Sequence, residues 1–351
     1  MSTSLPPLRS PLDLERVIEF EFVRATENAA LQAVGWLGRG EKELADAAAC
    51  SAIYGVFDLL DIQGEVVIGE GIKDKAPGIF VGEQLGTWKP GSPRFDIALD
   101  PIDGTTNIAK GTPNSISVIA AAQVPDGAPR AMKNVPSFYC HKVAYGPAVK
   151  RALASGPGHA SFLDMPLSEV IDFTADALEK HKRDVVVVTM DRPRHDPIIQ
   201  EIRASGAALR MISDGDITAA VAPSLPDSGV DLYVGIGGSP EGVLAAAALK
   251  CLGGDLQMRM WFHDEPHRAE VAGQTAASEM HRVYFAEDLV PGESALFCAT
   301  GISDSPLLPG VKLIGHRAET HSILMRARSG TVRHIRAVHQ LDRKVVPLRK
   351  L

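Results

Sequence analysis

Two aspartates stand three residues apart in the segment IALDPIDGTTN, residues 97–107. A proline between Asp100 and Asp103 forces an extended or turning backbone, and Gly104 permits close approach of another group. Thr105 lies where a helix could begin, so that free backbone N–H groups would face an anion. Two carboxylates this close repel each other unless a divalent cation holds them, and oxygen-only ligands favour Mg²⁺ or Mn²⁺ over zinc. Taken alone, the pair fits a helix-capping turn equally well.

A second acidic strand end shifts the balance toward a metal. The segment VVIGEGIKDKAPG, residues 66–78, places Glu70 between two glycines at the end of an apolar run, with Asp74 beyond it. Asp74 alone is better explained as a solvated loop charge. Together with Asp100 and Asp103, however, the set favours a divalent metal site.

The second half of the chain alternates strands with helices. Residues 184–190, 207–213 and 230–237 are rich in β-formers, and helical segments follow at 196–206, 217–222 and 241–254. This alternation predicts right-handed βαβ crossovers and a mostly parallel sheet. The loops DRPRHD, SDGD and GGSPE each follow a strand, and we expect them to share one site at the carboxyl edge of the sheet.

The first half begins with helices and the chain closes with a hairpin. Apolar spacing predicts a helix from Leu14 to Trp36 and a second from about Lys42 to Leu60, which carries Asp46 near its start. Residues 321–339 alternate around Ser329-Gly330 and predict a β-hairpin. The stretch 154–160 is the most linker-like part of the interior.

Bulk properties exclude several classes of protein. A net charge of −7 disfavours binding to nucleic acid or an anionic membrane. No apolar run approaches the roughly 18 residues of a membrane helix, and the N-terminal segment does not resemble a signal peptide, so we expect a cytoplasmic protein. The four cysteines are far apart, which favours reduced thiols over disulfides or zinc ligation.

The sequence also lacks the motifs of two common classes of nucleotide-binding protein. GIGGSPEG departs from G-x-G-x-x-G because Pro240 stands where the third glycine belongs, and no G-x-x-x-x-G-K-[ST] segment occurs.

The motifs resemble those of a known family. DPIDGT matches the signature of the lithium-sensitive, metal-dependent sugar and inositol phosphatases. WLGRGEKELAD, VVIGEG, RPRHD, SDGD, GIGGSPEGV, ATGI and LDRK, in order from Trp36 to Lys344, resemble class II fructose-1,6-bisphosphatases, including those that also accept sedoheptulose 1,7-bisphosphate.

The resemblance implies an α/β (α+β) fold with layers in the order α-β-α-β-α. It implies an N-terminal α+β metal-binding subdomain at 1–155 and a C-terminal α/β sugar-phosphate-binding subdomain at 156–351, with the hairpin packing back on the first. It further implies a homodimer or homotetramer.

Site residues are carried over from the family motifs. The resemblance implies metal binding by Asp46, Glu70, Asp100, Asp103 and Glu241, and catalytic roles for Asp74, Thr105, Asp46 and Glu70, in which Asp74 and Thr105 prepare and orient the attacking water. It implies substrate contacts by Lys42, Asp103, Gly104, Thr105, Tyr139, Arg192, Arg194, His195, Asp214, Gly215, Asp216 and Gly238. Class II enzymes commonly carry Glu where this chain has Asp103, so the number of metals stays open.

The implied reaction is hydrolysis of the 1-phosphate of fructose 1,6-bisphosphate by metal-activated water, as in gluconeogenesis or the Calvin cycle. Mg²⁺ or Mn²⁺ is the implied cofactor. The alternatives are a dual fructose/sedoheptulose bisphosphatase, a broad inositol or sugar monophosphatase, and a catalytically silent sugar-phosphate sensor. The cations of RPRH precede a helix that Asp196 would cap, and they favour a substrate with a second phosphate.

Overall fold

The computed structural model describes residues 14–69, 79–156 and 161–349. Within these ranges, no helix combines the length and apolar character that crossing a membrane requires. Glu70 and Asp74, two of the predicted site residues, lie outside the described residues.

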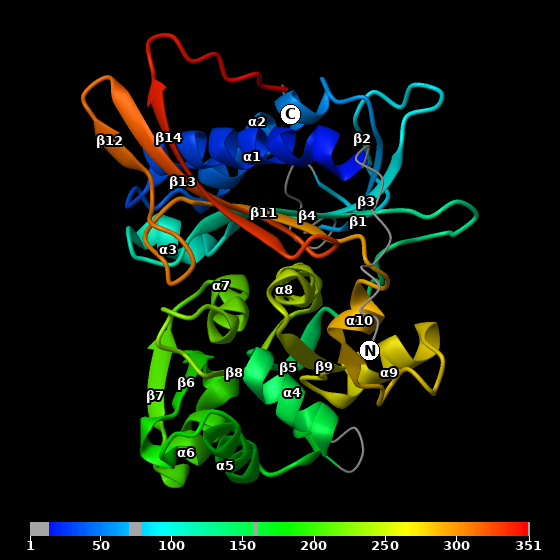
Figure 1. Ribbon diagram of the computed structural model, residues 1–351, viewed down its shortest axis with the longest axis vertical. Helices are drawn as coiled ribbons and strands as arrows, with labels where there is room; N and C mark the ends of the chain where they lie inside the picture. The colour runs from blue at the N-terminus through cyan, green and yellow to red at the C-terminus, as the bar shows by residue number, and fades with distance from the viewer. Residues whose placement is uncertain (1–13, 70–78, 157–160, 350–351) are drawn as a thin grey trace, which may run out of the picture.

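Two β-sheets organise the described chain (Figure 1). The first has strand order β12-β13-β11-β4-β3-β1-β2, with β14 paired to the other edge of β13. Its strands are β1 Gln63–Ile68, β2 Gln84–Leu85, β3 Arg94–Asp103, β4 Ile116–Gln123, β11 Leu296–Gly301, β12 Lys312–Ile314, β13 Arg317–Arg326 and β14 Thr331–Gln340. The second has order β10-β9-β5-β8-β6-β7, formed by β5 Tyr139–Tyr145, β6 Val186–Met190, β7 Ala208–Ile212, β8 Leu232–Gly238, β9 Asp255–Met260 and β10 Tyr284–Phe285.

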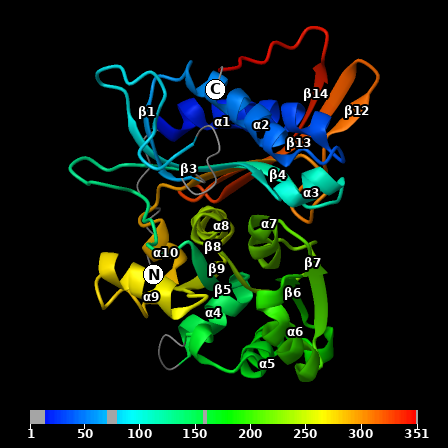
Figure 2. The same cartoon turned by 180° about the vertical axis from the view of Figure 1, so that it is seen from behind.

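Helices cover both sheets and fill the space between them. α1 Leu14–Ala33 and α2 Lys42–Phe57 lie on the outer face of the first sheet, and α7 Asp216–Val221 and α8 Ser239–Leu252 lie between the sheets (Figures 1 and 2). α4 Pro147–Ser155, α5 Leu167–Ala177 and α6 Asp196–Ser205 cover the far face of the second sheet. The remaining elements are α3 Thr105–Lys110, α9 Glu265–Gln274, α10 Ala286–Leu289 and 3₁₀ turns at Val34–Trp36, Phe162–Asp164, Lys182–Asp184, Pro193–His195 and Ala222–Ser224. The layered α-β-α-β-α fold expected from the sequence is therefore confirmed.

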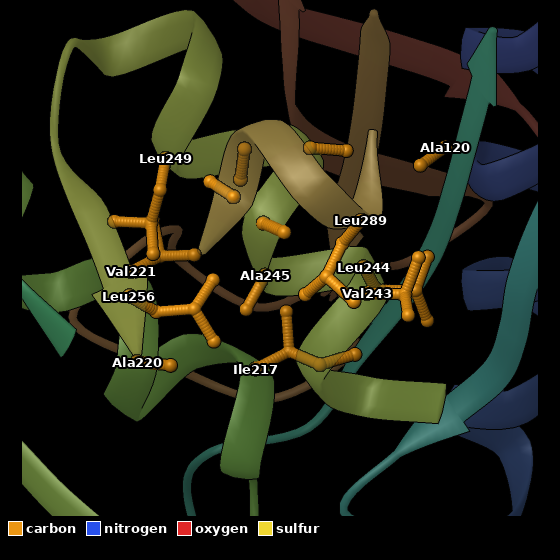
Figure 3. Packing of buried hydrophobic residues seen from close by; sticks show 14 of the residues in the cluster. Ala120, Ile217, Ala220, Val221, Val243, Leu244, Ala245, Leu249, Leu256 and Leu289 are labelled. Carbon is orange, nitrogen blue, oxygen red and sulfur yellow. The ribbon is translucent and has the colours of Figure 1, made fainter. Parts of the chain in front are cut away.

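The middle helical layer explains the alanine-rich run of α8. Figure 3 shows its side chains Val243, Leu244 and Ala245 packed among residues of α7, α10 and both sheets. A helix buried on every side must be apolar all round, and small side chains let two sheets approach it closely. β4 has the matching pattern in a strand: Val118 points into this core, whereas Ile119 points into the core under α1 and α2. Because helices cover both faces, residues 118–122 of β4 form a continuous apolar run rather than an alternating one.

The mostly parallel sheet predicted for the second half is wrong. Among the described strand pairs of the second sheet, only β6–β7 and β6–β8 are parallel, and β5 pairs antiparallel with both β8 and β9. The alternating segments do form the parallel part, but β5 arrives from the first half of the chain and inserts between β8 and β9. Local alternation does not encode this long-range insertion.

The C-terminal hairpin is confirmed. β13 and β14 pair in continuous antiparallel register, and β13 also pairs with β11 of the first sheet. The predicted boundary at residue 155 stays a prediction. β5 and α4, which precede it, belong with the second sheet, and β11–β14, which follow it, complete the first.

The segment after the hairpin lies against α2. A Cβ at Gly55 would overlap the carbonyl oxygen of Pro347, so only glycine permits this approach. The Arg349 guanidinium stacks over the Tyr54 ring at 4.4 Å, and its Nε donates to Asp58 Oδ2 at 2.9 Å. These contacts fix the segment to the helix that carries Asp46.

Candidate active site

The two aspartates of the opening motif lie at the end of β3, where its pairing with β4 becomes irregular. Asp100 and Asp103 are both 4% exposed. Asp100 Oδ1 accepts from the Ile102 backbone N–H at 2.9 Å, and Asp103 Oδ2 accepts from Ile217 N–H of α7 at 3.2 Å. Gly104 follows with φ of 92° and α3 begins at Thr105, as the sequence predicts. Asp103 therefore faces the second half of the chain rather than solvent.

The SDGD loop lies directly against this strand end. Asp214 Oδ2 accepts from Thr106 N–H at 3.1 Å. Gly104 and Gly215, both at positive φ, pack on the same carbonyl: a Cβ at Gly104 would overlap Asn114 O, and one at Gly215 would lie 2.9 Å from it. The two acidic loops are thus held face to face.

A buried amide links the same loops. Asn107, fully buried, donates to Asn114 O at 2.9 Å and accepts from Ser213 Oγ at 2.7 Å. We call Asn107, Asn114 and Ser213 the inter-loop junction. It joins the end of the first sheet to the loop that follows β7.

Sequence reasoning missed a cation at the centre of the site. Lys142 of β5 is 1% exposed, forms an ion pair with Asp216, and donates to the Gly238 carbonyl at 2.7 Å. The other Asp216 oxygen accepts from the Tyr233 hydroxyl. Both oxygens of Asp216 are therefore engaged within the protein. A signal was present in the sequence. Lys142 lies two residues after Cys140, on the same face of the strand, and a buried lysine is rare unless it is paired.

The glycines of GIGGSPEG make room for acids, not for a dinucleotide. A Cβ at Gly237 would overlap the Asp216 carboxylate, and one at Gly238 would overlap that of Glu241. Glu241 Oε2 is buried and has no hydrogen-bond partner among the described residues. The turn from β8 to α8 therefore delivers a buried, incompletely satisfied carboxylate next to Asp216.

Burial and mutual repulsion perturb this acidic group. Burial raises the pKa of Asp103 well above its usual value, and the charges of Asp214, Asp216 and Glu241 raise it further. Burial likewise raises the pKa of Glu241, while Lys142 opposes that change. Four carboxylates share one low-dielectric region, which is costly unless cations or protons neutralise them.

Among the described residues, the side chains of Asp46 and Lys42 form hydrogen bonds or ion pairs only with other residues of α2. Burial raises the pKa of Asp46 to about 6, and the hydrogen bond from Cys50 Sγ at 3.8 Å opposes this. Asp46 Oδ1 is buried without a partner among the described residues. Lys42 is exposed and lies 3.7 Å from Glu43. No group of three or more His, Cys, Asp and Glu side chains in the described ranges forms an arrangement ready to hold a metal.

The RPRH segment supplies two cations beside the acids. Arg192 Nη2 lies 3.7 Å from Asp214 Oδ1. Arg194 donates through Nε to Ile236 O at 2.8 Å, and its guanidinium lies 5.1 Å from the centre of the Tyr139 ring. The expectation that DRPRHD, SDGD and GGSPE meet is therefore confirmed, because each loop contacts another.

His195 differs from the other members of that segment. It is fully buried, and its Nε2 accepts from Ile236 N–H at 2.7 Å. Burial, followed by the Arg194 charge, lowers its pKa to about 4, so the ring is neutral near pH 7. It anchors β8 and adds no positive charge to the loop. Asp196, expected as the helix cap, is instead the first residue of α6.

Comparison with known proteins places the chain. Residues 16–339 match the family described as bacterial fructose-1,6-bisphosphatase, glpX-encoded. A class 2 fructose-1,6-bisphosphatase of Haemophilus influenzae is 40% identical over 340 residues, covering 94% of this chain and 98% of that protein. Fructose-1,6-bisphosphatase 1 class 2 of Escherichia coli is 36% identical over 342 residues, covering 94% and 97%. The chain belongs to the family of glpX-encoded, class 2 bacterial fructose-1,6-bisphosphatases.

Proposed function

We propose that this chain hydrolyses the 1-phosphate of fructose 1,6-bisphosphate, giving fructose 6-phosphate and phosphate, through water activated by divalent metal ions. Besides the family relationship, one observation supports this proposal: a buried group of carboxylates lies directly beside a loop with two arginines. Such a site can bind a metal-bridged phosphate at one end and a second phosphate at the other.

The carboxylates present fit Mg²⁺ or Mn²⁺. Asp46 Oδ1 and Glu241 Oε2 are buried oxygens without partners among the described residues, and burial raises the pKa of both side chains. Oxygen donors of this kind suit hard cations, which would favour the ionised carboxylates. We assign metal binding to Asp46, Asp100, Asp103 and Glu241, together with Glu70 from outside the described residues. When bound, such ions lower the pKa of water and neutralise phosphate charge.

The residues around the proposed metal ligands would orient the reacting groups. We assign Thr105, the first residue of α3, to orient the attacking water, and Asp74 to help prepare it, on the basis of the family resemblance. Asp103 is held by the α7 backbone, which fixes the carboxylate before substrate arrives. Fixed donors and acceptors need not reorganise during the reaction, which lowers its barrier.

The distal phosphate is assigned to Arg192 and Arg194. Arg194 is aimed by the Ile236 carbonyl and by its place over the Tyr139 ring, and among the described residues its terminal nitrogens have no hydrogen-bond partner, so they can bind an anion. The sugar is assigned to Asp214 and to the backbone at Gly104, Gly215 and Gly238. His195 and Asp216 support this site from within the protein, since the first is a neutral buried anchor and the second has both oxygens engaged. Lys42 is exposed and is assigned to the incoming phosphate.

The test is phosphate release from fructose 1,6-bisphosphate, sedoheptulose 1,7-bisphosphate and fructose 1-phosphate across a Mg²⁺ and Mn²⁺ titration. Arg194→Ala should raise KM for the bisphosphates on the order of 10²-fold and change that for the monophosphate little. Arg203→Ala, an exposed arginine of α6, is the control. Equal effects on all substrates would remove the assignment of the distal phosphate, and a wild-type chain without phosphate release would overturn the activity.

Two further assignments rest on the family resemblance. Comparable turnover of the six- and seven-carbon substrates would favour a dual enzyme, and preference for the monophosphate would favour a broader phosphatase. A homodimer or homotetramer is the expected assembly, which light scattering measures.

A further inference from the structure

Lys142 occupies a position that the reaction as described does not use. We propose that Lys142 is a positioning residue for the phosphatase reaction: it clamps the peptide group between Gly238 and Ser239, and so fixes the turn that presents Glu241. The inference rests on the proposed function in assigning Glu241 to a metal.

The clamp acts on both polar atoms of one peptide group. The Gly238 carbonyl accepts from Lys142 Nζ at 2.7 Å, and the Ser239 N–H of the same peptide donates to Phe138 O at 2.6 Å. A peptide group is planar, so fixing its two polar atoms fixes its orientation. That peptide joins the last residue of β8 to the first residue of α8, and Glu241 follows two residues later.

The surroundings of Lys142 are built to bring its amine to this carbonyl. In the sheet Lys142 pairs with Gly235, yet its side chain extends along β8 to reach Gly238, three residues further on. A Cβ at Gly237 would lie 3.1 Å from Nζ, and one at Gly242 would lie 3.5 Å from Cδ. The first distance is tighter than an ordinary contact, so the glycine at position 237 leaves room for the amine, whereas the second is an ordinary van der Waals contact along the lysine side chain.

Stability alone does not explain the lysine. Buried ion pairs can often be replaced by apolar residues without loss of stability, because desolvation of the two charges offsets their attraction. An apolar residue at position 142 could fill the volume between Cys140 and Ala144. It could not donate to the Gly238 carbonyl, however, and this hydrogen bond is the one that holds the turn leading to Glu241.

Three variants separate the clamp from the ion pair. Lys142→Met removes both contacts of the amine and leaves Asp216 buried without its counter-ion. Asp216→Asn keeps an oxygen for Lys142 and leaves the Gly238 contact. The double variant removes both charges, so neither member of the ion pair is left without its counter-ion.

Three measurements are made on each variant: the urea midpoint of unfolding, Mn²⁺ binding to the metal-free protein by calorimetry, and phosphate release from fructose 1,6-bisphosphate. Lys142→Met should weaken Mn²⁺ binding and lower kcat by about 10- to 100-fold, the range found when groups that orient metal ligands are removed. Asp216→Asn should change both by less. The double variant should recover the urea midpoint but keep the weak Mn²⁺ binding and low kcat of Lys142→Met.

Two results would overturn the inference. Wild-type Mn²⁺ affinity in Lys142→Met would show that the clamp has no effect on the metal site. Recovery of Mn²⁺ affinity and kcat in the double variant, together with its stability, would show that Lys142 only balances the charge of Asp216. Should Lys142→Met not fold, the double variant carries the same readouts. If the wild type releases no phosphate, the proposed function fails, and the Mn²⁺ affinity of Lys142→Met compared with the wild type still decides whether the clamp acts on the metal site.

Discussion

Replacing His195 with glutamine tests whether this residue is a buried neutral anchor or a cation for substrate. The glutamine side chain cannot titrate, yet its amide oxygen can still accept the hydrogen bond that Ile236 N–H now donates to Nε2 at 2.7 Å. The His195 side chain is fully buried, and burial and the Arg194 charge lower its pKa to about 4 from a usual value of 6.5.

The sign of the pH effect follows from that lowered pKa. Between pH 6.5 and about 4, His195 takes up a proton in the unfolded chain but not in the folded one. The free energy of unfolding therefore falls as pH falls through this window. At about 1.4 kcal/mol for each pH unit, the loss is about 3 kcal/mol in total. Above pH 6.5 the residue contributes no pH dependence.

Other groups titrate over the same range, so the variant must be compared with the wild type. Lowered pKa values of His141 and His339 act in the same direction, and the raised pKa of Asp46 acts in the opposite one. Arg192 and Asp216 face the His195 ring, the first lowering its pKa and the second raising it. The contributions of His141, His339 and Asp46 are common to both proteins and cancel in the difference, whereas the effects of Arg192 and Asp216 are part of the His195 shift that the comparison measures.

The assay is urea unfolding of wild type and His195→Gln at several pH values from about 7 to 4. The wild type should lose about 3 kcal/mol more than the variant over that range. A second arm follows KM for fructose 1,6-bisphosphate from about pH 6 to pH 8, where the two proteins should show the same trend. Parallel loss of stability in both, or a wild-type KM that rises with pH while that of the variant stays flat, would refute the buried neutral ring.

Three further perturbations have defined outcomes. Gly104→Ala places a side chain at a φ of 92° where it would overlap Asn114 O, and it should lower the free energy of unfolding by about 2–4 kcal/mol in urea. Gly206→Ala, at a φ of 83° with open space around it, should lower it by about 1 kcal/mol. Equal losses in the two variants would contradict the steric reasoning. Arg349→Ala removes the ion pair with Asp58 and the stacking on Tyr54 of α2, and it should lower the free energy of unfolding by about 1–2 kcal/mol in thermal unfolding. Arg349→Lys should give a loss between those of the wild type and Arg349→Ala. No change in Arg349→Ala would mean that the segment does not stabilise the helix. Removal of divalent cations by EDTA should abolish phosphate release, and Mg²⁺ or Mn²⁺ should restore it; activity that persists in the chelator counts against the metal mechanism.

Local pattern predicted the elements that carry the site. The apolar run before Asp100, the glycine after Asp103 and the helix starting at Thr105 all follow from short-range sequence signals, and the structure reproduces them. The three loops of the second half meet because strand–helix alternation brings the ends of β6, β7 and β8 together.

Long-range placement could not be predicted in the same way. β5 lies between β8 and β9 because of pairing across many residues, and its lysine becomes a site residue only through that pairing. His195 was expected as a cation because it follows two arginines, but its charge depends on burial against β8, which the segment itself does not encode. Glu70 and Asp74 lie outside the described residues, so their roles stay predictions.

The inter-loop junction bears on attempts to re-engineer specificity. Asn107 accepts a hydrogen bond from Ser213 Oγ and donates one to Asn114 O, and Gly104 and Gly215 both pack on that same carbonyl. The SDGD loop is consequently not a module that can be grafted from a relative by itself. A loop from a relative that lacks Ser213 or Gly215 would shift the end of β3 as well, so a change made to alter substrate choice would also move Asp100 and Asp103.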